Sequence, residues 1–323
     1  MSILLDVQDL VVKFRLRSGD LTALNGINFT LASGERMGLV GESGAGKSVA
    51  GFSIINLISK PGFIASGRVL FEGEEISSYP LEQMRDIRGN RISMIFQDPM
   101  MTLNPVLTIG TQMVETIQAH ANVSTAHARE IALEKLTKVY ISSPGKRLGQ
   151  YPHELSGGMR QRVVIAISLL TNPSLIIADE PTTALDVTIQ AEVMALLLEL
   201  CKNEQMGLIL ITHDLGVVSQ VTEKIAVMYA GRIVEQGPTA DIVSSPRHPY
   251  TQGLIRALPQ GSGGQRRLYQ IPGMMPNLTS IPVGCAFHPR CEQAMDICRQ
   301  EAPALCAPHQ SPGLVACHLF RSR

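Results

Sequence analysis

A glycine-rich loop between a short apolar strand and a helix constrains this chain's fold more than any other feature. Met37–Val40 is an apolar run, and the segment after it, Gly41–Ser48, reads GESGAGKS. It fits the pattern G-x-x-x-x-G-K-[ST], whose glycines let several backbone N–H groups face one anion at the positive end of the next helix. A helix is expected from about Lys47. The strand and the helix distinguish this loop from a chance match in a glycine-rich segment, so the sequence predicts a phosphate-binding loop.

The loop assigns roles to individual side chains. Lys47 is expected to reach the β- and γ-phosphates of a nucleotide, and Ser48 is expected to ligate Mg²⁺. The other residues expected to contact the nucleotide here are Gly41, Ser43, Gly44, Ala45, Gly46 and Val49.

A second apolar strand ends in adjacent carboxylates. Leu175–Glu180 reads LIIADE, which places Asp179 at the carboxyl end of a buried strand. Asp179 is predicted to join the Mg²⁺ shell, and Glu180 is predicted to polarise the attacking water. The alternative is a pair of solvated loop charges. With the phosphate loop elsewhere in the chain, the catalytic interpretation is favoured.

The remaining pattern predicts an α/β fold with several parts. Residues 4–14 and 23–31 alternate apolar and polar positions, as antiparallel strands do, whereas residues 174–180 and 207–214 are continuous apolar strands of the buried, parallel type. Residues from about 100 to 168 are rich in helix formers and predict an inserted helical subdomain. The sequence therefore predicts a mixed sheet with an antiparallel β subdomain, the helical subdomain and a small C-terminal extension.

Composition narrows the class of protein. Apolar residues make up 45% of the 323-residue chain, charged residues 17% and aromatic residues 4%, and the net charge is zero without any Trp. These values exclude global disorder and do not favour a nucleic-acid partner. The N-terminus lacks the basic start of a signal peptide, and no apolar run is long enough to span a bilayer. A cytosolic chain is therefore expected.

The segment Glu154–Arg162, ELSGGMRQR, resembles the signature motif of ABC transporter ATPases. Other positions then match the family's motifs in order: Gln97 the Q-loop, Ala184–Asp186 the D-loop and His213 the switch histidine. Phe14 lies where the family stacks an aromatic ring on adenine; the alternative is a strand core residue. The resemblance covers roughly residues 3–258.

The resemblance implies a mechanism. Ser156, Gly157 and Gly158 would bind the γ-phosphate of an ATP held by a second ATPase subunit, in a head-to-tail dimer. Ser48, Gln97 and Asp179 would hold Mg²⁺. Lys47, Gln97, Glu180 and His213 would carry the hydrolysis of ATP.

Two further stretches resemble the bacterial oligopeptide/dipeptide permease family, namely Phe96–Gly110 and His248–Pro259. The resemblance implies peptide import across the inner membrane, with the chain bound to its cytoplasmic face. The implied partners are a second, usually non-identical ATPase, two transmembrane permease subunits and a periplasmic or extracellular substrate-binding protein. A membrane subunit would dock near Met100, Met101 and Leu103, although these residues also suit a subdomain core.

Alternatives to peptide import remain open from the sequence. Close relatives carry nickel, glutathione or antimicrobial peptides. Some ATPases with the same signature are soluble DNA-repair, chromosome or translation factors, but these typically have a coiled coil, a basic surface or tandem ATPase domains. A non-catalytic nucleotide-binding module is opposed by Glu180 and His213.

Five of the six cysteines lie near the C-terminus, and Cys201 reads as a small buried residue of the ATPase core. Cys285, Cys291 and Cys298 are more widely spaced than usual zinc ligands, and a proline-rich tail is too short to build a core of its own. The candidates are a [4Fe–4S] cluster, Zn²⁺ or free thiols. The family resemblance implies a cluster on Cys285, Cys291, Cys298 and Cys317, with Cys306 as the spare or as a replacement for Cys317.

A change in composition predicts the domain boundary. Residues 259–267, PQGSGGQRR, are a glycine- and serine-containing linker. The predicted division is an ABC ATPase domain over residues 1–258 and a C-terminal extension with the cysteine cluster over residues 259–323.

Overall fold

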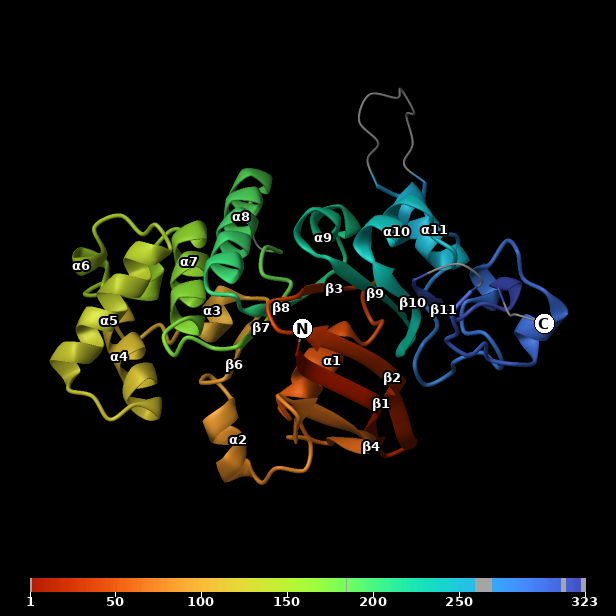
Figure 1. The fold of residues 1–323 in the computed structure, drawn as a ribbon, viewed down its shortest axis with the longest axis horizontal. Coiled ribbons are helices and arrows are strands. Elements are labelled where there is room, and N and C mark those ends of the chain that lie inside the picture. The colour runs from red at the N-terminus through yellow and green to blue at the C-terminus, as the bar shows by residue number, and fades with distance from the viewer. Residues whose placement is uncertain (1, 184, 259–268, 309–311, 321–323) are drawn as a thin grey trace. The chain divides into compact units, whose positions relative to one another are not determined.

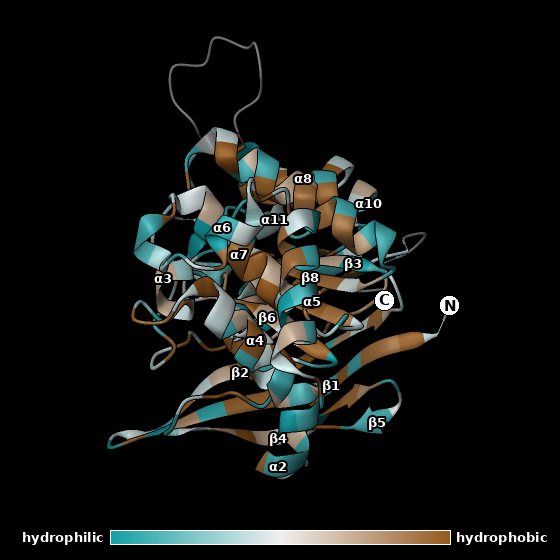
Figure 2. Cartoon of the chain, turned by 90° about the vertical axis from the view of Figure 1, so that its left-hand side faces the viewer, coloured by the Kyte–Doolittle hydropathy of each residue, from teal (hydrophilic) through white to brown (hydrophobic). Residues whose placement is uncertain are grey.

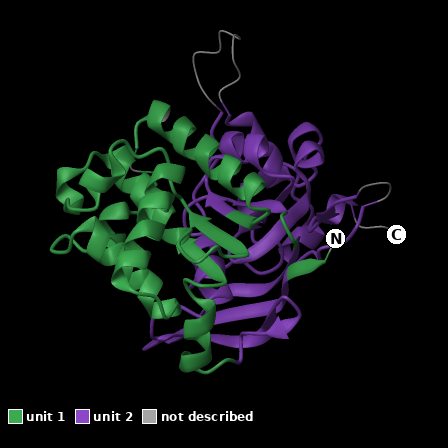
Figure 3. Ribbon diagram, turned by 60° about the vertical axis from the view of Figure 1, so that its left-hand side comes forward, with its two compact units in different colours: residues 1–4, 32–34, 79–209 green, residues 5–31, 35–78, 210–323 purple. Residues whose placement is uncertain are grey.

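The computed structural model describes residues 2–183, 185–258, 269–308 and 312–320. Figure 1 shows the course of the chain. The chain divides into two compact units. Unit 1 comprises residues 1–4, 32–34 and 79–209, and unit 2 comprises residues 5–31, 35–78 and 210–323, as Figure 3 shows. The predicted linker, residues 259–267, lies outside the described residues, and the predicted boundary falls directly before it. The predicted domain division therefore stays a prediction.

Unit 2 contains an antiparallel sheet of order β2-β1-β4-β5. Its strands are β1 (Ile3–Leu16), β2 (Gly19–Ala32), β4 (Gly62–Phe71) and β5 (Glu74–Glu75). In β1, Leu5 and Val7 are buried before an irregularity in the register between Gln8 and Val11, and Leu10 and Val12 are buried with the alternation shifted by one residue. The register pairs Val7 with Val69 of β4. The antiparallel strands predicted from alternation are therefore confirmed, because one face of each strand packs into a core.

Unit 2 also contains a mixed sheet. Strand β3 (Arg36–Val40) is parallel to β9 (Lys224–Tyr229), which pairs antiparallel with β10 (Arg232–Pro238). The C-terminal tail adds β11 (Leu314–Val315) to the edge of β10. The helices of unit 2 are α1 (Lys47–Ile54), α9 (Leu215–Val221), α10 (Thr239–Ser244) and α11 (Pro249–Arg256). The tail contributes 3₁₀ turns over His288–Arg290, Asp296–Arg299 and His318–Phe320.

Unit 1 combines two parallel strands with the predicted helical region. Strand β6 (Ile92–Ile95) pairs in parallel with β7 (Leu175–Asp179), whose residues are all buried. The helices are α2 (Leu81–Ile87), α3 (Pro99–Thr102), α4 (Ile109–His120), α5 (Thr125–Lys138), α6 (Pro144–Arg147), α7 (Gly157–Ser168) and α8 (Val187–Asn203). Strand β8 (Gly207–Thr212) is fully buried, and its residues are divided between the two units.

The helical region follows from local signals in the sequence. Thr108 caps α4 and Ser124 caps α5, each accepting a hydrogen bond from the backbone N–H three residues later at 3.2 Å. Both helices bury one face, with Met113 and Ala132 fully enclosed. In Figure 2, α4, α5 and α7 carry both brown and teal stretches, which is typical of amphipathic helices. Cys201 in α8 is buried, as expected.

Within the described part of the chain, none of the helices has the length and apolar character needed to cross a bilayer.

Candidate nucleotide and cysteine sites

The phosphate loop follows β3 and ends where α1 begins at Lys47, as predicted. Gly46 has φ 100°, and a Cβ there would lie 3.0 Å from the carbonyl oxygen of Ala23. A Cβ at Gly41 would lie 2.4 Å from the carbonyl oxygen of Met228. Only glycine fits both the dihedral angle and the close approach. The loop's conformation is therefore fixed by neighbouring strands of unit 2.

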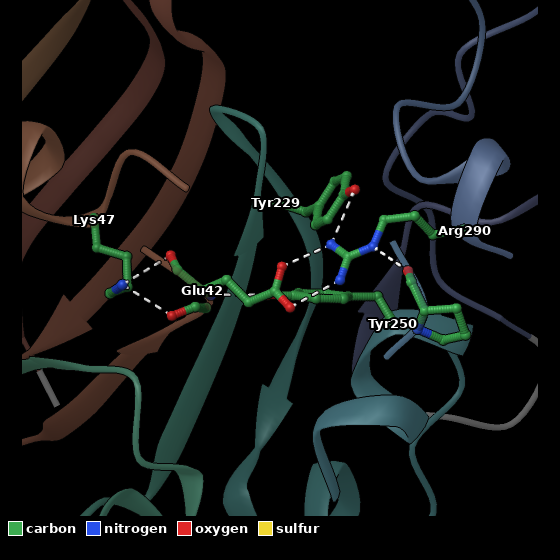
Figure 4. A network of polar contacts seen from close by, with 7 residues as sticks. Glu42, Lys47, Tyr229, Tyr250 and Arg290 are labelled. Carbon is green, nitrogen blue, oxygen red and sulfur yellow. Dashed lines mark hydrogen bonds and ion pairs between the residues drawn. The ribbon is translucent and has the colours of Figure 1, made fainter. Parts of the chain in front are cut away.

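Lys47 is nearly fully buried, with 5% of its surface exposed. Its Nζ donates to the carbonyl oxygens of Gly41, at 2.8 Å, and Glu42, at 3.1 Å, as Figure 4 shows. The ammonium group thus lies against the loop at the N-terminal end of α1, where the helix dipole also favours an anion.

The other loop residues differ in exposure. Ser43 and Gly44 are exposed, Ser48 and Val49 are half-buried, and Ala45 is buried.

A carboxylate centre lies at the ends of the parallel strands in unit 1. Asp179 ends β7 and is buried, with 3% exposed. The Glu180 carboxylate accepts hydrogen bonds from Nε2 of Gln97, at 3.2 Å, and from the hydroxyl of Thr183, at 2.8 Å. The structure therefore brings Gln97 and Glu180 together, although they are far apart in sequence.

Glu180 has a strained backbone, with φ 45°. A non-glycine residue in this region costs about 1–3 kcal/mol, and such residues cluster at functional sites because the surrounding structure holds them there. Thr183 fixes the carboxylate of this residue, and sequence reasoning did not single it out. Its signal was its place three residues after Glu180, within a turn in which its N–H donates to the carbonyl oxygen of Glu180.

The signature segment begins α7 in unit 1. Ser156 caps this helix, its hydroxyl accepting from the N–H of Met159 at 3.4 Å. Ser156 and Gly157 are exposed, and Gly158 is half-buried. The N-terminus of a twelve-residue helix is thus presented at the surface of this unit, which suits an anion.

The remaining predicted positions lie as follows. His213 is exposed directly after β8, and Asp214 caps α9 by accepting from the N–H of Gly216 at 2.8 Å. Phe14 is half-buried, and its ring lies against Gly62 of β4. Ala184 of the D-loop lies outside the described residues.

The predicted nucleotide residues belong to both units. Phe14, Gly41–Val49 and His213 are in unit 2, while Gln97, Ser156–Gly158, Asp179 and Glu180 are in unit 1. Each group is organised within its own unit.

Four cysteines of the tail line one small cavity in unit 2, here called the cysteine pocket: Cys285, Cys291, Cys298 and Cys317. The backbone brings them together. The N–H of Cys285 donates to the carbonyl oxygen of Cys298 at 2.8 Å. A Cβ at Gly284 would lie 2.4 Å from that same oxygen, so glycine is needed for the approach.

Cys306 does not line the cysteine pocket. It forms an isolated bridge with Val315, donating and accepting backbone hydrogen bonds at 3.1 and 2.8 Å. This placement favours Cys317 over Cys306 as the fourth member of the set.

The thiols of the cysteine pocket are poorly solvated. Burial raises the pKa of Cys285 and Cys291, and burial raises the pKa of Cys317 to about 11. Among the described residues, no group of three or more His, Cys, Asp or Glu side chains is arranged to hold a metal ion. The four cysteines share a cavity, and neither a cluster nor Zn²⁺ is confirmed.

Comparison with known proteins places the chain in a family. Residues 24–183 match the family described as "ABC transporter", and residues 234–298 match "Oligopeptide/dipeptide transporter, C-terminal region". A probable peptide ABC transporter ATP-binding protein of Sinorhizobium fredii is 49% identical, with 94% of this chain and 91% of that protein covered. The oligopeptide transport ATP-binding protein OppD of Salmonella typhimurium is 48% identical over 94% of this chain and 90% of its own length.

Solved structures agree with this result. The dimeric ATP-binding cassette MJ0796, in a post-hydrolysis state bound to ADP and Pi, superposes with a TM-score of 0.66 at 26% identity, covering 73% of this chain and 99% of that one. The chain belongs to the ABC transporter ATP-binding proteins, in the group that carries the oligopeptide/dipeptide transporter C-terminal region.

Proposed function

We propose that this chain is the ATP-hydrolysing subunit of an ABC importer for peptides. The observation that carries the proposal is the phosphate loop, with Lys47 already turned onto it, in a chain that also has the hydrogen-bonded Gln97–Glu180 pair. The names of the relatives from Sinorhizobium and Salmonella support peptides as the cargo.

Each residue has a role in the proposed reaction. The loop's backbone N–H groups and Lys47 bind and orient the phosphates of ATP. Glu180, held by Gln97 and Thr183, takes the proton of the attacking water, and His213 contacts the γ-phosphate. When bound, Mg²⁺ supplies charge neutralisation at the phosphoryl group, and Ser48, Gln97 and Asp179 would hold it.

The proposed assembly contains a second ATPase subunit. Ser156, Gly157 and Gly158 bind the γ-phosphate of the nucleotide held by that subunit, through the exposed N-terminus of α7. Phe14 supports the adenine ring, and its half-buried position in β1 is compatible with that role.

The membrane subunits would dock on the exposed methionines of α3. Met100 is 42% and Met101 is 84% exposed, whereas Leu103 is buried. Leu103 therefore acts as a core residue, and the two methionines supply adaptable apolar contacts. The chain would sit peripherally on the cytoplasmic face of the bacterial inner membrane, below two permease subunits and an external binding protein.

We propose that the cysteine pocket holds a [4Fe–4S] cluster through Cys285, Cys291, Cys298 and Cys317. Their common cavity and the family resemblance support this assignment. Zn²⁺ and free thiols are the alternative outcomes.

Purification of the intact complex tests the importer proposal. A tagged full-length chain is expected to bring down two membrane subunits, and the binding protein of the complex should hold peptides identifiable by mass spectrometry. Nickel or glutathione in the binding protein would show that the complex carries that substrate rather than peptides. Recovery with DNA or ribosomes, without membrane subunits, would overturn the proposal.

Docking is tested with Met101→Asp in the assembled complex. Transport is expected to be lost while the isolated subunit hydrolyses ATP at its usual rate. Equal loss of both activities in a folded protein would favour a core role for this residue.

A further inference from the structure

Arg290 of the C-terminal tail reaches the phosphate loop. It ends the 3₁₀ turn directly before Cys291, and only 6% of its side chain is exposed. Its guanidinium donates to both carboxylate oxygens of Glu42, at 2.7 and 3.0 Å, and its Nε donates to the carbonyl oxygen of Pro272 at 2.8 Å. Figure 4 shows this network.

Glu42 is the second residue of the phosphate loop, and its N–H, its carbonyl oxygen and its carboxylate all form hydrogen bonds. Its N–H donates to the hydroxyl of Tyr250 in α11, at 2.8 Å. Its carbonyl oxygen accepts from Lys47, and its carboxylate is bound by Arg290. The residue that begins the turn of the loop is therefore fixed by two side chains from residues 249–290, far along the chain.

The pair of Arg290 and Glu42 differs from an ordinary surface ion pair. It is bidentate, and the guanidinium lies within 6 Å of the rings of Tyr229 and Phe287, at 5.8 and 5.9 Å. Tyr229 also accepts a long hydrogen bond from Arg290, at 3.4 Å. The bonds to Glu42 raise the pKa of Arg290 above its ordinary value. A planar, buried fork of this kind fixes geometry as well as charge.

Glu42 also brings a negative charge into a loop that binds phosphates. An unpaired carboxylate there would repel the nucleotide and could turn toward Lys47. The side chain of Glu42 is 30% exposed, so solvent alone screens it only in part. Arg290 both neutralises this charge and holds it away from the ammonium group.

We propose that Arg290 is a positioning residue for the phosphate loop, through which the cysteine-containing tail sets the affinity of the chain for nucleotide. This inference rests on the proposed ATP site and adds a residue outside it. The segment between Cys285 and Cys291 supplies both Phe287 and Arg290. Phe287 packs edge-on against Tyr229, with ring centroids 5.2 Å apart, so the tail approaches the loop as one packed group.

The test is equilibrium binding of a fluorescent ATP analogue to the purified full-length chain. Arg290→Met keeps the length of the side chain beside the aromatic rings but removes its charge and donors. We expect roughly tenfold weaker binding, because one partner of a buried charge pair has been removed. Arg290→Lys keeps the charge without the fork and should bind about threefold more weakly.

A double variant separates positioning from general damage. Glu42→Gln combined with Arg290→Met removes the unpaired carboxylate, and we expect it to recover at least about threefold of the lost affinity. A loss caused by the missing packing of Arg290, rather than by the unpaired carboxylate, would not be reversed by this second substitution. Arg299→Ala, which changes an exposed arginine of the same tail, is the matched control and should bind as the wild type does.

The outcomes distinguish the two proposals. If the wild-type chain binds no ATP, the proposed function fails. If it binds ATP and folded Arg290→Met binds equally well, the inference about Arg290 is overturned. Should Arg290→Met not fold, wild-type affinity in Arg290→Lys would overturn it in the same way, as would a double variant no better than the single one.

Discussion

The phosphate loop and the cysteine pocket are both ligand sites predicted from sequence, but they are built differently. The loop is one contiguous segment, Gly41–Ser48, whose backbone is set by glycines and whose lysine already lies on it. The cysteine pocket collects side chains from separate stretches of the tail, and burial raises the pKa of the Cys285, Cys291 and Cys317 thiols. The loop is ready before its ligand arrives, whereas a metal entering the pocket would have to displace the protons of the thiols.

The largest expected effect is the loss of bound iron from the cysteine pocket. In anaerobically purified protein we expect about four iron atoms per chain. Cys291→Ser should lose this iron, and Cys306→Ser should keep it, because Cys306 is bridged to Val315 outside the pocket. Iron and sulfide analysis with absorption spectra is the measurement. Stoichiometric zinc, or iron lost in Cys306→Ser but kept in Cys317→Ser, would contradict the assignment.

The second prediction is a loss of ATP affinity when the lysine of the phosphate loop is removed. Lys47→Ala removes the charged donor to the phosphates, and hydrogen bonds to charged groups contribute about 1.5–3 kcal/mol each. We expect ATP affinity to fall roughly a hundredfold. Calorimetric titration measures it, with the exposed Lys202→Ala as the control. Iron content should not change, and a joint loss of iron and affinity would mean that the two sites fold as one.

The sequence predicted the loop well because its motif specifies backbone geometry over adjacent residues. Strand β3, the glycine turn and the start of α1 at Lys47 all followed from that motif. It did not predict the pair of Glu42 and Arg290, whose members are 248 residues apart. Only the folded chain brings such residues together, since charge and spacing carry no signal at that distance.

The same limit applies to smaller details. Met100 and Met101 look like Leu103 in sequence, yet only Leu103 is buried, because it follows α3 in an extended conformation while the methionines lie within the short helix. The sequence predicted that cysteines of the tail gather, but the position of Cys306 outside the cysteine pocket became visible only from the lining of the pocket and the pairing of the Cys306 backbone with Val315.

The third prediction concerns acid stability near the cysteine pocket. His248 is 1% exposed, and burial lowers its pKa from 6.5 to about 3. The unfolded chain takes up the proton below pH 6.5 and the folded chain does not, so stability is full above pH 6.5 and is lost as pH falls toward 3. At pH 5 the expected loss is about 2 kcal/mol.

Thermal unfolding between pH 7 and pH 5 measures this effect. His248→Asn keeps an acceptor at the N-cap of α11, where the histidine ring accepts from the N–H of Tyr250, but cannot ionise. Its melting temperature should change less with pH than that of the wild type. Parallel curves for the two proteins would show that another group controls acid stability.

The smallest expected effect concerns the hydrogen bond between the backbone of the phosphate loop and Tyr250. Tyr250→Phe removes the hydroxyl that accepts from the N–H of Glu42 but leaves the buried ring in place. A neutral hydrogen bond contributes about 0.5–1.5 kcal/mol, so ATP should bind about threefold more weakly. A loss as large as that of Arg290→Met would mean that the backbone contact, rather than the charge pair, positions the loop.

The most direct test of the proposed function is ATP hydrolysis by the assembled complex carrying Glu180→Gln. The amide keeps the size of the side chain and its contact with Gln97 but cannot accept the proton of water. We expect turnover at least about a hundredfold lower, no peptide uptake, and ATP still bound. Hydrolysis and uptake at the wild-type rate would contradict the assignment of Glu180 and, with it, the proposed mechanism.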